Sequence, residues 1–176
     1  MNEIIKKNAL TFGLISGIIS ILTYTLIYVI NVEYFVSVWL GLAGLAISIT
    51  LACILLARTK KELKGNLSFK EAFTTYFIMA LISLAIATTF SIILFNLIDP
   101  TLKETLKELT LKKTASLMGQ FGAPQSEINK ALKTVADTDQ FSVFAQLKGI
   151  LTSIVVSSIF GFILAAFFNT PNRQDI

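Results

Sequence analysis

The sequence predicts an all-α integral membrane protein, a four-helix bundle with an amphipathic helical hairpin between its third and fourth spans. Of the 176 residues, 54% are hydrophobic and 15% are charged, whereas soluble domains have about 45–50% apolar and about 25% charged residues. Four stretches contain no Asp, Glu, Lys or Arg, and each is long enough to cross a hydrocarbon core about 30 Å thick. We expect one membrane domain over residues 1–176.

The uncharged stretches set the limits of the expected spans. We place the spans at about residues 8–32, 34–57, 70–98 and 145–168, with a helical insert at about 99–144. The first stretch follows two lysines as in a signal peptide, but it is too long and no small-residue cleavage site follows it. We expect it to be retained as a span.

Helix signals are clear between the second and third spans. Basic residues at 58–61 favour the negative end of a helix dipole, and Gly65 can adopt the left-handed backbone that ends a helix. Ser68 and Glu71 have the spacing of a capping box, in which each side chain satisfies a free backbone donor of the other. A new helix is therefore expected directly after Ser68.

The insert has the periodicity of two short helices. Asp99 and Pro100 can serve as N-cap and first helical residue, and a break follows at residues 119–124, which include two glycines and a proline. Leucines and other apolar residues lie on one face before and after this break: Leu102, Leu106 and Leu109, then Ile128, Leu132 and Val135. This pattern predicts two amphipathic helices that fold against each other or onto the membrane surface.

Basic residues predict the orientation in the membrane. Lys6 and Lys7 precede the first span and five basic residues lie at 58–70, whereas the connection between the first two spans contains Glu33 and no base. The positive-inside rule then places the amino terminus, the 58–71 loop and the carboxyl terminus with Arg173 in the cytoplasm. The insert is expected outside, where its lysines are nearly balanced by acids.

The inventory of reactive side chains excludes many activities. The chain has no histidine and one cysteine, Cys53, so histidine-based catalysis, histidine-ligated haem and a cysteine-rich metal site are ruled out. No ionisable residue lies in the central part of a span, which disfavours proton-coupled transport. We predict no enzyme activity, no catalytic residue, no metal and no cofactor. The basic residues flank spans and do not alternate with aromatic residues, so no nucleic-acid partner is expected.

Small residues recur at helical spacing in every span and predict helix contacts, because apolar helices in lipid associate through close backbone approach. We interpret these positions as packing faces, within the chain or in a homodimer. The proposed packing residues are Gly13, Gly17, Gly44, Ser48, Ser153, Ser157, Gly161 and Ala165.

A second candidate feature lies near the outer end of the bundle. Glu33, Asn96 and Asp99 could form an outer polar cluster that binds a cation or a lipid headgroup. The alternative for Asp99 is a helix cap. An aromatic belt at the headgroup level is the interpretation of Tyr24, Tyr28, Tyr34 and Trp39.

Several short segments resemble a known family, the bacterial four-span membrane proteins catalogued as domain-of-unknown-function family 4199. The similar segments are KNALTFGLISG at 7–17, LSFKEAF at 67–73, IDP at 98–100, the region of Met118, and GFILAA at 161–166. The resemblance implies a bacterial inner-membrane protein with four spans and a helical insert. It implies no activity and no catalytic residue.

Three functions remain after these exclusions, and the least favoured is a membrane enzyme that uses Glu33, Asn96 or Asp99 with a metal supplied by its substrate. The first is a non-enzymatic scaffold or accessory subunit that contacts membrane lipid, a protein partner or a second copy of the chain. The alternative is a small oligomeric channel or transporter, in which hydroxyl groups such as those of Ser48, Thr50, Thr88 and Thr89 line a path. Hydroxyls in helices more often hydrogen-bond to their own backbone, which favours the first function.

Overall fold

The part of the chain that the structure describes is built from six α-helices, four of which are long and apolar enough to cross a membrane. The computed structural model describes residues 2–170. Within this range the helices are α1 (Glu3–Ile30), α2 (Val38–Glu62), α3 (Phe69–Ile93), α4 (Leu102–Gln120), α5 (Gln125–Asp137) and α6 (Val143–Phe168), with a short 3-10 helix η1 (Val32–Val36) and a π-helical turn η2 (Leu94–Ile98). The predicted all-α class is confirmed, with four candidate spans and two helices between the third and fourth.

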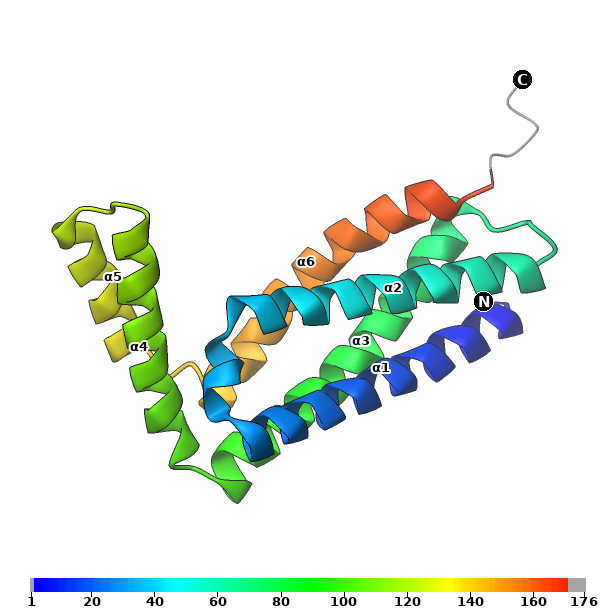
Figure 1. Cartoon of the computed structure of the whole chain (residues 1–176). Helices are drawn as coiled ribbons and strands as arrows, with labels where there is room; N and C mark the ends of the chain where they lie inside the picture. The colour runs from blue at the N-terminus through cyan, green and yellow to red at the C-terminus, as the bar shows by residue number, and fades with distance from the viewer. Residues whose placement is uncertain (1, 171–176) are drawn as a thin grey trace.

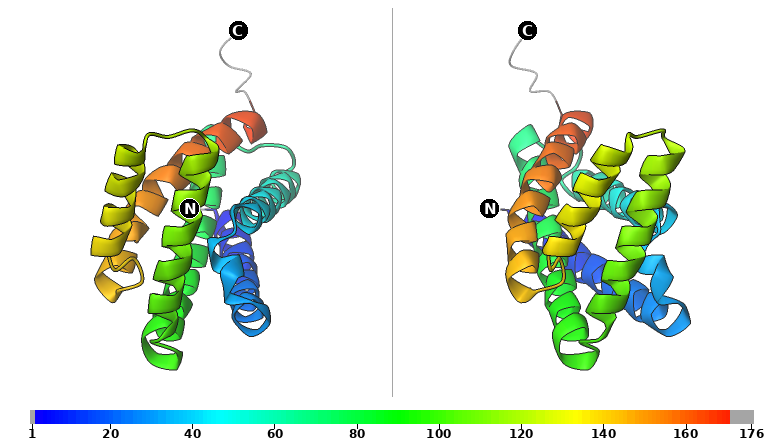
Figure 2. Two further views of the ribbon diagram at one scale, coloured as in Figure 1. Left: turned by 60° about the vertical axis from the view of Figure 1, so that its left-hand side comes forward. Right: turned by 90° about the vertical axis from the view of Figure 1, so that its left-hand side faces the viewer.

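The four long helices run along one another, and the hairpin of α4 and α5 lies across one end of them (Figure 1). In both views of Figure 2, α4 and α5 lie side by side and antiparallel. The amino terminus lies at the opposite end of the bundle from the hairpin. The molecule therefore has a hairpin end and a terminal end.

Helix α3 is the centre of the bundle, since α1 packs along one side of it and α6 along another. Glycines let these helices approach: a Cβ atom on Gly17 would lie 2.6 Å from Cδ1 of Ile86, and one on Gly161 would lie 2.8 Å from Cδ1 of Tyr76. Helix α2 has far less contact with α1 and α6 than α3 has. Helices α1, α3 and α6 thus form a tight unit, and α2 is attached to it along part of its length.

Two expected boundaries are corrected by the turns that precede them. The second span was expected from residue 34, but α2 begins at Val38 because η1 intervenes, with Asn31 Oδ1 accepting from the Glu33 amide at 2.9 Å. The first helix of the insert was expected to begin at Pro100, but this helix, α4, begins at Leu102. Asp99 Oδ1 instead accepts from the Thr101 amide at 3.2 Å and forms a turn before the helix.

The capping box at the start of α3 is confirmed. The Ser68 hydroxyl accepts from the Glu71 amide at 3.3 Å, and the Ser68 amide donates to Glu71 Oε2 at 3.0 Å. Both backbone donors would otherwise lack partners at a helix start. The third helix therefore begins where local side-chain chemistry predicts.

The connection between α2 and α3 is tied to the end of α6. The Thr170 amide donates to the Leu67 carbonyl at 2.8 Å, and Lys60 Nζ donates to the Asn169 carbonyl at 3.4 Å. The end of α6 and this connection thus lie together at the terminal end. The predicted position of Arg173 falls outside the described residues.

Candidate functional site

The two ends of the bundle differ in how tightly they are packed. At the terminal end, side chains from all four long helices form a closed hydrophobic core, in which Leu55 and Leu56 have no exposed surface. The buried members of this core are Phe12, Ala52, Leu55, Leu56, Leu67, Ala72, Met79, Leu164 and Ala165. A hollow of about 380 Å³ at this end lies outside the core, along Glu3, Lys6, Lys7, Leu10 and Thr11 at the start of α1.

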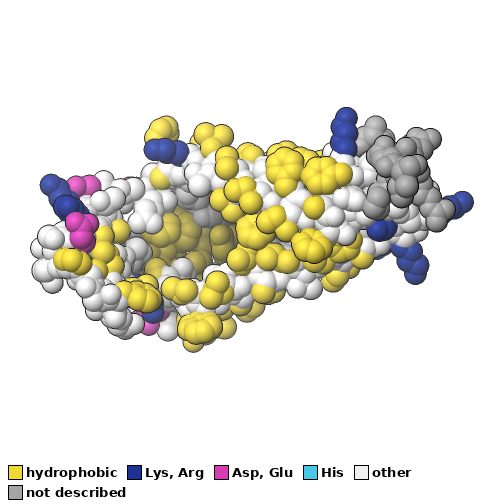
Figure 3. Space-filling model, turned by 90° about the horizontal axis from the view of Figure 1, so that it is seen from above, with side chains coloured by type: hydrophobic (Ala, Val, Ile, Leu, Met, Phe, Trp, Pro, Cys, Tyr) yellow, Lys and Arg dark blue, Asp and Glu magenta, His cyan; other side chains and the backbone are white. Residues whose placement is uncertain are grey.

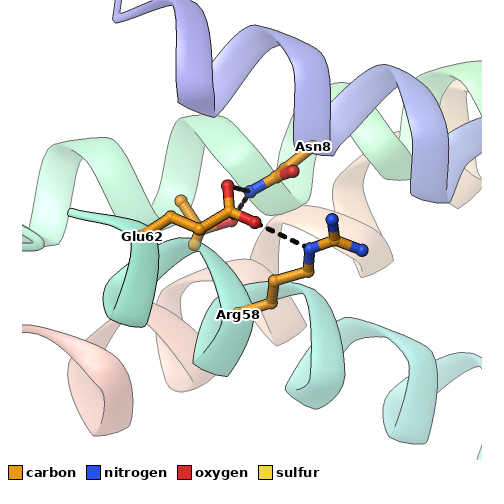
Figure 4. A network of polar contacts seen from close by, with 4 residues as sticks. Asn8, Arg58 and Glu62 are labelled. Atoms are coloured by element: carbon orange, nitrogen blue, oxygen red, sulfur yellow. Dashed lines mark hydrogen bonds and ion pairs between the residues drawn. The ribbon is translucent and has the colours of Figure 1, made fainter. Parts of the chain in front are cut away.

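A polar network next to this core joins α1 to α2 (Figure 4). Asn8 is only 2% exposed, and its amide Nδ2 donates to Glu62 Oε2 at 2.8 Å and to Thr59 Oγ1 at 3.3 Å. The other carboxylate oxygen of Glu62 accepts from Arg58 Nε at 2.8 Å. Because a buried amide without partners would be costly, these bonds hold the two helices together at this position. We assign the network a structural role.

At the hairpin end, α2 separates from α1 and leaves a groove of about 540 Å³, a volume within the usual range of ligand pockets. We call this the α1–α2 groove. Its walls come mainly from α1, α2 and η1, and the ends of α3 and α6 complete it. The residues that define it are Ser16, Ile19, Ser20, Thr23, Tyr24, Ile27, Tyr34, Phe35, Ser37, Leu40, Gly41, Ala43, Gly44, Ile47, Ser48, Leu51, Ser91, Phe95, Gln140, Phe141 and Gln146.

The α1–α2 groove has an apolar lining with neutral polar groups, and no charged residue is among its lining residues in the described part of the chain. Ser20 donates its hydroxyl hydrogen to the Ser16 carbonyl at 3.0 Å, and Ser91 donates to Gln146 Oε1 at 2.6 Å. These two hydroxyl protons are already bonded, so Ser20 and Ser91 offer the groove acceptor oxygens and no free donor. Such a lining suits a hydrocarbon chain better than a hydrated ion.

A smaller pocket of about 280 Å³ adjoins the groove at the base of the hairpin. We call it the lysine pocket, because Lys103 and Lys107 line it, together with Pro100, Glu104, Thr138, Asp139, Gln140 and Phe141. Lys103 Nζ donates to Asn96 Oδ1 at 2.6 Å, and Asn96 Nδ2 donates to the Phe141 carbonyl at 3.4 Å. Asn96 thus links the π-helical turn, the hairpin and the start of α6.

The face in Figure 3 has a hollow between the hairpin and the long helices. Hydrophobic side chains border the hollow, and the charged side chains on this face gather toward the two ends of the molecule. The apolar middle corresponds to the helices that could span a membrane. The charged ends are where headgroups and water would surround the protein.

The outer polar cluster expected from the sequence does not form as one site. Among the described residues, Glu33, Asn96 and Asp99 make no hydrogen bond to one another: Glu33 is exposed, Asn96 binds Lys103, and Asp99 binds Thr101 and Tyr28. The hydroxyl of Thr101, 2.6 Å from Asp99 Oδ1, is the main reason why the pKa of this carboxyl lies below its ordinary value. Asp99 is not the N-cap of α4 either, since Thr101 occupies that position, and the Asp99 carboxylate instead fixes the turn that precedes the helix.

The small residues predicted to pack fall into two groups. Gly13, Gly17, Gly161 and Ala165 lie at helix contacts, where a Cβ atom on Gly13 would be 2.8 Å from Cβ of Ile82 and Ala165 is fully buried. Gly44 has nothing within 4 Å of its Cβ position, so it makes no close helix contact within the described chain, and its expected packing role stays a prediction for a homodimer. Ser48 lines the groove instead, because α2 has separated from its neighbours. Ser153 and Ser157 line small cavities between α3 and α6.

Comparison with known proteins identifies the family. The model of the family described as protein of unknown function (DUF4199) matches residues 11–170. The chain belongs to this family. The match covers α1 from Thr11 through the end of α6, and so includes the groove, the lysine pocket and the hairpin of this DUF4199 protein. A search of the curated proteins and a search of the solved structures each found no match to it.

Proposed function

We propose that this DUF4199 protein is a non-enzymatic scaffold or accessory subunit of the bacterial inner membrane, with both termini in the cytoplasm and the hairpin outside. It contacts membrane lipid or a protein partner through the hairpin end of the bundle. The observation that carries the proposal is the difference between the two ends: the terminal end is closed, and the hairpin end has an open groove. The basic residues of the α2–α3 connection support the orientation.

The hairpin is a suitable contact element because it is anchored at its base and free at its tip. Leu102 and Leu106 are buried against Leu94 and Phe95 at the end of α3. At the tip, the side chain of Phe121 is 88% exposed. An exposed aromatic residue on a fixed support is typical of a contact residue in a protein interface.

The alternative is an oligomeric channel or transporter, and one observation favours it. A cavity of about 240 Å³ between α2, α3 and α6 shares Ser16 and Ser48 with the groove, so hydroxyl-bearing surfaces extend toward the middle of the bundle. Against it, the closed core at Leu55 and Leu56 ends this series of cavities, and a path for ions needs polar groups that replace hydration along its whole length. The scaffold is therefore the better supported function.

Two measurements on the full chain test the proposal. A photo-crosslinking amino acid at Gln120, next to the exposed tip, should trap a discrete partner or a homodimer in native membranes. The same group at Glu33, exposed at the hairpin end but outside the hairpin, is the matched control. Phe121→Ser should remove the crosslink at Gln120, because it removes the apolar contact at the tip.

The second measurement uses sealed liposomes that contain the purified protein. Flux of protons, potassium or sodium should equal that of empty vesicles. Selective flux from a folded preparation, together with no crosslink specific to Gln120, would reject the scaffold and support the channel.

A further inference from the structure

The α1–α2 groove and the lysine pocket adjoin, because Gln140 and Phe141 line both of them. The ring of Phe141 packs on that of Phe95 with centroids 4.9 Å apart, which fixes the boundary between the two pockets. One pocket is uncharged and at span depth, and the other is polar and at the base of the hairpin. The two pockets together match one amphiphilic molecule, whose headgroup would lie in the lysine pocket and whose hydrocarbon chain would lie in the α1–α2 groove.

The charge of the lysine pocket indicates the kind of headgroup. Lys103 and Lys107 are both half-buried, and neither forms an ion pair among residues 2–170. Lys103 is held only by the neutral amide of Asn96. Glu104 and Asp139 also line the pocket, but both are exposed and so are better screened by water. Two partly desolvated ammonium groups without a carboxylate partner are complementary to a phosphate.

The groove indicates the rest of the ligand. Apolar side chains from α1 and α2 line this open space, and no charged residue is among its lining residues in the described chain. These side chains include Ile19, Ile27, Leu40 and Ile47. At this depth the surrounding solvent is lipid acyl chain. Several of its hydroxyl protons are already bonded to backbone, as for Thr23, whose Oγ1 donates to the Ile19 carbonyl at 2.8 Å. Hydrocarbon in the groove therefore leaves these donors satisfied.

We propose that the two pockets bind one anionic phospholipid, with its phosphate near Lys103 and Lys107 and an acyl chain in the α1–α2 groove. This inference rests on the proposed function, and it names the class of lipid that the protein would contact. The site lies in the leaflet next to the hairpin, whichever side of the membrane that is. A failure of lipid binding would leave the crosslink at the hairpin tip untouched, so the two proposals are tested separately.

The headgroup is tested with the purified full chain in detergent, by native mass spectrometry with phosphatidylglycerol and phosphatidylcholine of identical acyl chains. Wild-type protein should retain phosphatidylglycerol in preference. Lys103→Ala with Lys107→Ala should reduce this preference by about fivefold per lysine, the usual contribution of a lysine near an anionic lipid surface. Lys112→Ala with Lys113→Ala is the matched control, because these lysines are exposed on the same helix and line neither pocket.

The acyl-chain groove is tested by filling it. Gly44→Leu places a side chain in the groove, and the fold should accept it because nothing lies within 4 Å of the Gly44 Cβ position. It should weaken retention of both lipids alike. Ala46→Leu, on the same helix but outside the groove lining, should leave retention unchanged.

Three results would overturn the lipid proposal. The first is equal retention of the two lipids by wild-type protein, and the second is an equal loss with the Lys112 and Lys113 pair. The third is a change in oligomeric state with Gly44→Leu while lipid retention stays the same, which would assign the groove to a helix of a second copy.

Discussion

At the scale of single residues, the same residue type has opposite roles at different positions of this bundle. Gly17 allows α1 and α3 to touch, since a Cβ atom there would lie 2.6 Å from Ile86, whereas Gly44 faces the open groove. In the sequence both belong to the same kind of small-residue stripe. The spacing predicts which residues share a helix face, and only the fold decides what that face meets.

This difference predicts opposite responses to one substitution. Gly17→Leu should lower the free energy of unfolding by about 1–3 kcal/mol, because an overpacked contact must shift or adopt strained rotamers. Gly44→Leu should have little effect on stability. Unfolding of both variants in mixed micelles of increasing SDS fraction measures the difference. Equal tolerance of the two substitutions would show that α1 and α3 are not in tight contact at Gly17.

Asp99 gives a prediction on pH dependence. Its pKa is lowered in the folded protein, chiefly by the hydrogen bond from Thr101. A carboxyl group whose pKa is lowered by folding stabilises the protein above its ordinary pKa, and this stabilisation is lost as the pH falls through the lowered value. Wild-type protein should therefore be more stable than Asp99→Asn at pH 7, and the difference should shrink as the pH falls below the ordinary carboxyl value of about 4 and vanish only below the lowered pKa.

Thermal unfolding in detergent at pH 7 and pH 3 measures this difference. Asp137→Asn, at an exposed position at the end of α5, serves as a control for the change in net charge. A gap between wild type and Asp99→Asn that is equal at both pH values would contradict a stabilising role for the ionised Asp99 carboxylate in the turn before α4.

At the scale of elements, the sequence predicts well which helices exist. It predicts poorly how these helices are placed relative to one another. Lengths of uncharged stretches are sufficient to predict the four long helices, because only about 20 apolar residues are needed to cross a bilayer. The capping box at Ser68 is local and was predictable. The π-helical turn at Leu94–Ile98 was not, since its residues are as apolar as the helix before it and it depends on contacts with α4 and η1.

The capping box leads to a prediction for α3. Ser68→Ala removes the acceptor for the Glu71 amide and should cost about 1 kcal/mol of stability. Ser126→Ala is the control, at an exposed position in the first turn of α5 with no hydrogen bond to its side chain among the described residues. Unfolding in mixed micelles compares the two variants. Equal stability of both would mean that the packing of α3 alone determines where it begins.

At the scale of the whole molecule, the candidate site depends on one feature that was not predicted from the sequence, the separation of α2 from α1 at the hairpin end. The signal was present as small and hydroxyl residues on facing sides of α1 and α2, at 16, 20 and 23 and at 37, 41, 44 and 48. Such residues are as typical of close helix contacts as of a groove. The lysine pocket could not be predicted from the sequence either, because it forms only where the base of α4 meets the segment before α6.

The distance between the hairpin end and the terminal end of the bundle also allows a direct test of orientation in the membrane. The connection between α2 and α3 and the tip of the hairpin lie at opposite ends of the bundle, so they should lie on opposite sides of the membrane. Single cysteines in a Cys53→Ser background report on each side. Gln120 is suitable at the hairpin end because it is exposed. At the other end Asn66 is preferable to Lys64, whose φ of 55° makes a substitution there less neutral.

We expect Gln120→Cys to react with a membrane-impermeant maleimide on intact cells, and Asn66→Cys to react only after the cells are permeabilised. The physical reason is the cluster of basic residues around Asn66, which is retained on the cytoplasmic side during insertion. Permeabilised cells are the internal control, because both positions are exposed and should then react alike. Reaction of Asn66→Cys alone on intact cells would invert the orientation, place the hairpin in the cytoplasm and move the lysine pocket to the inner leaflet.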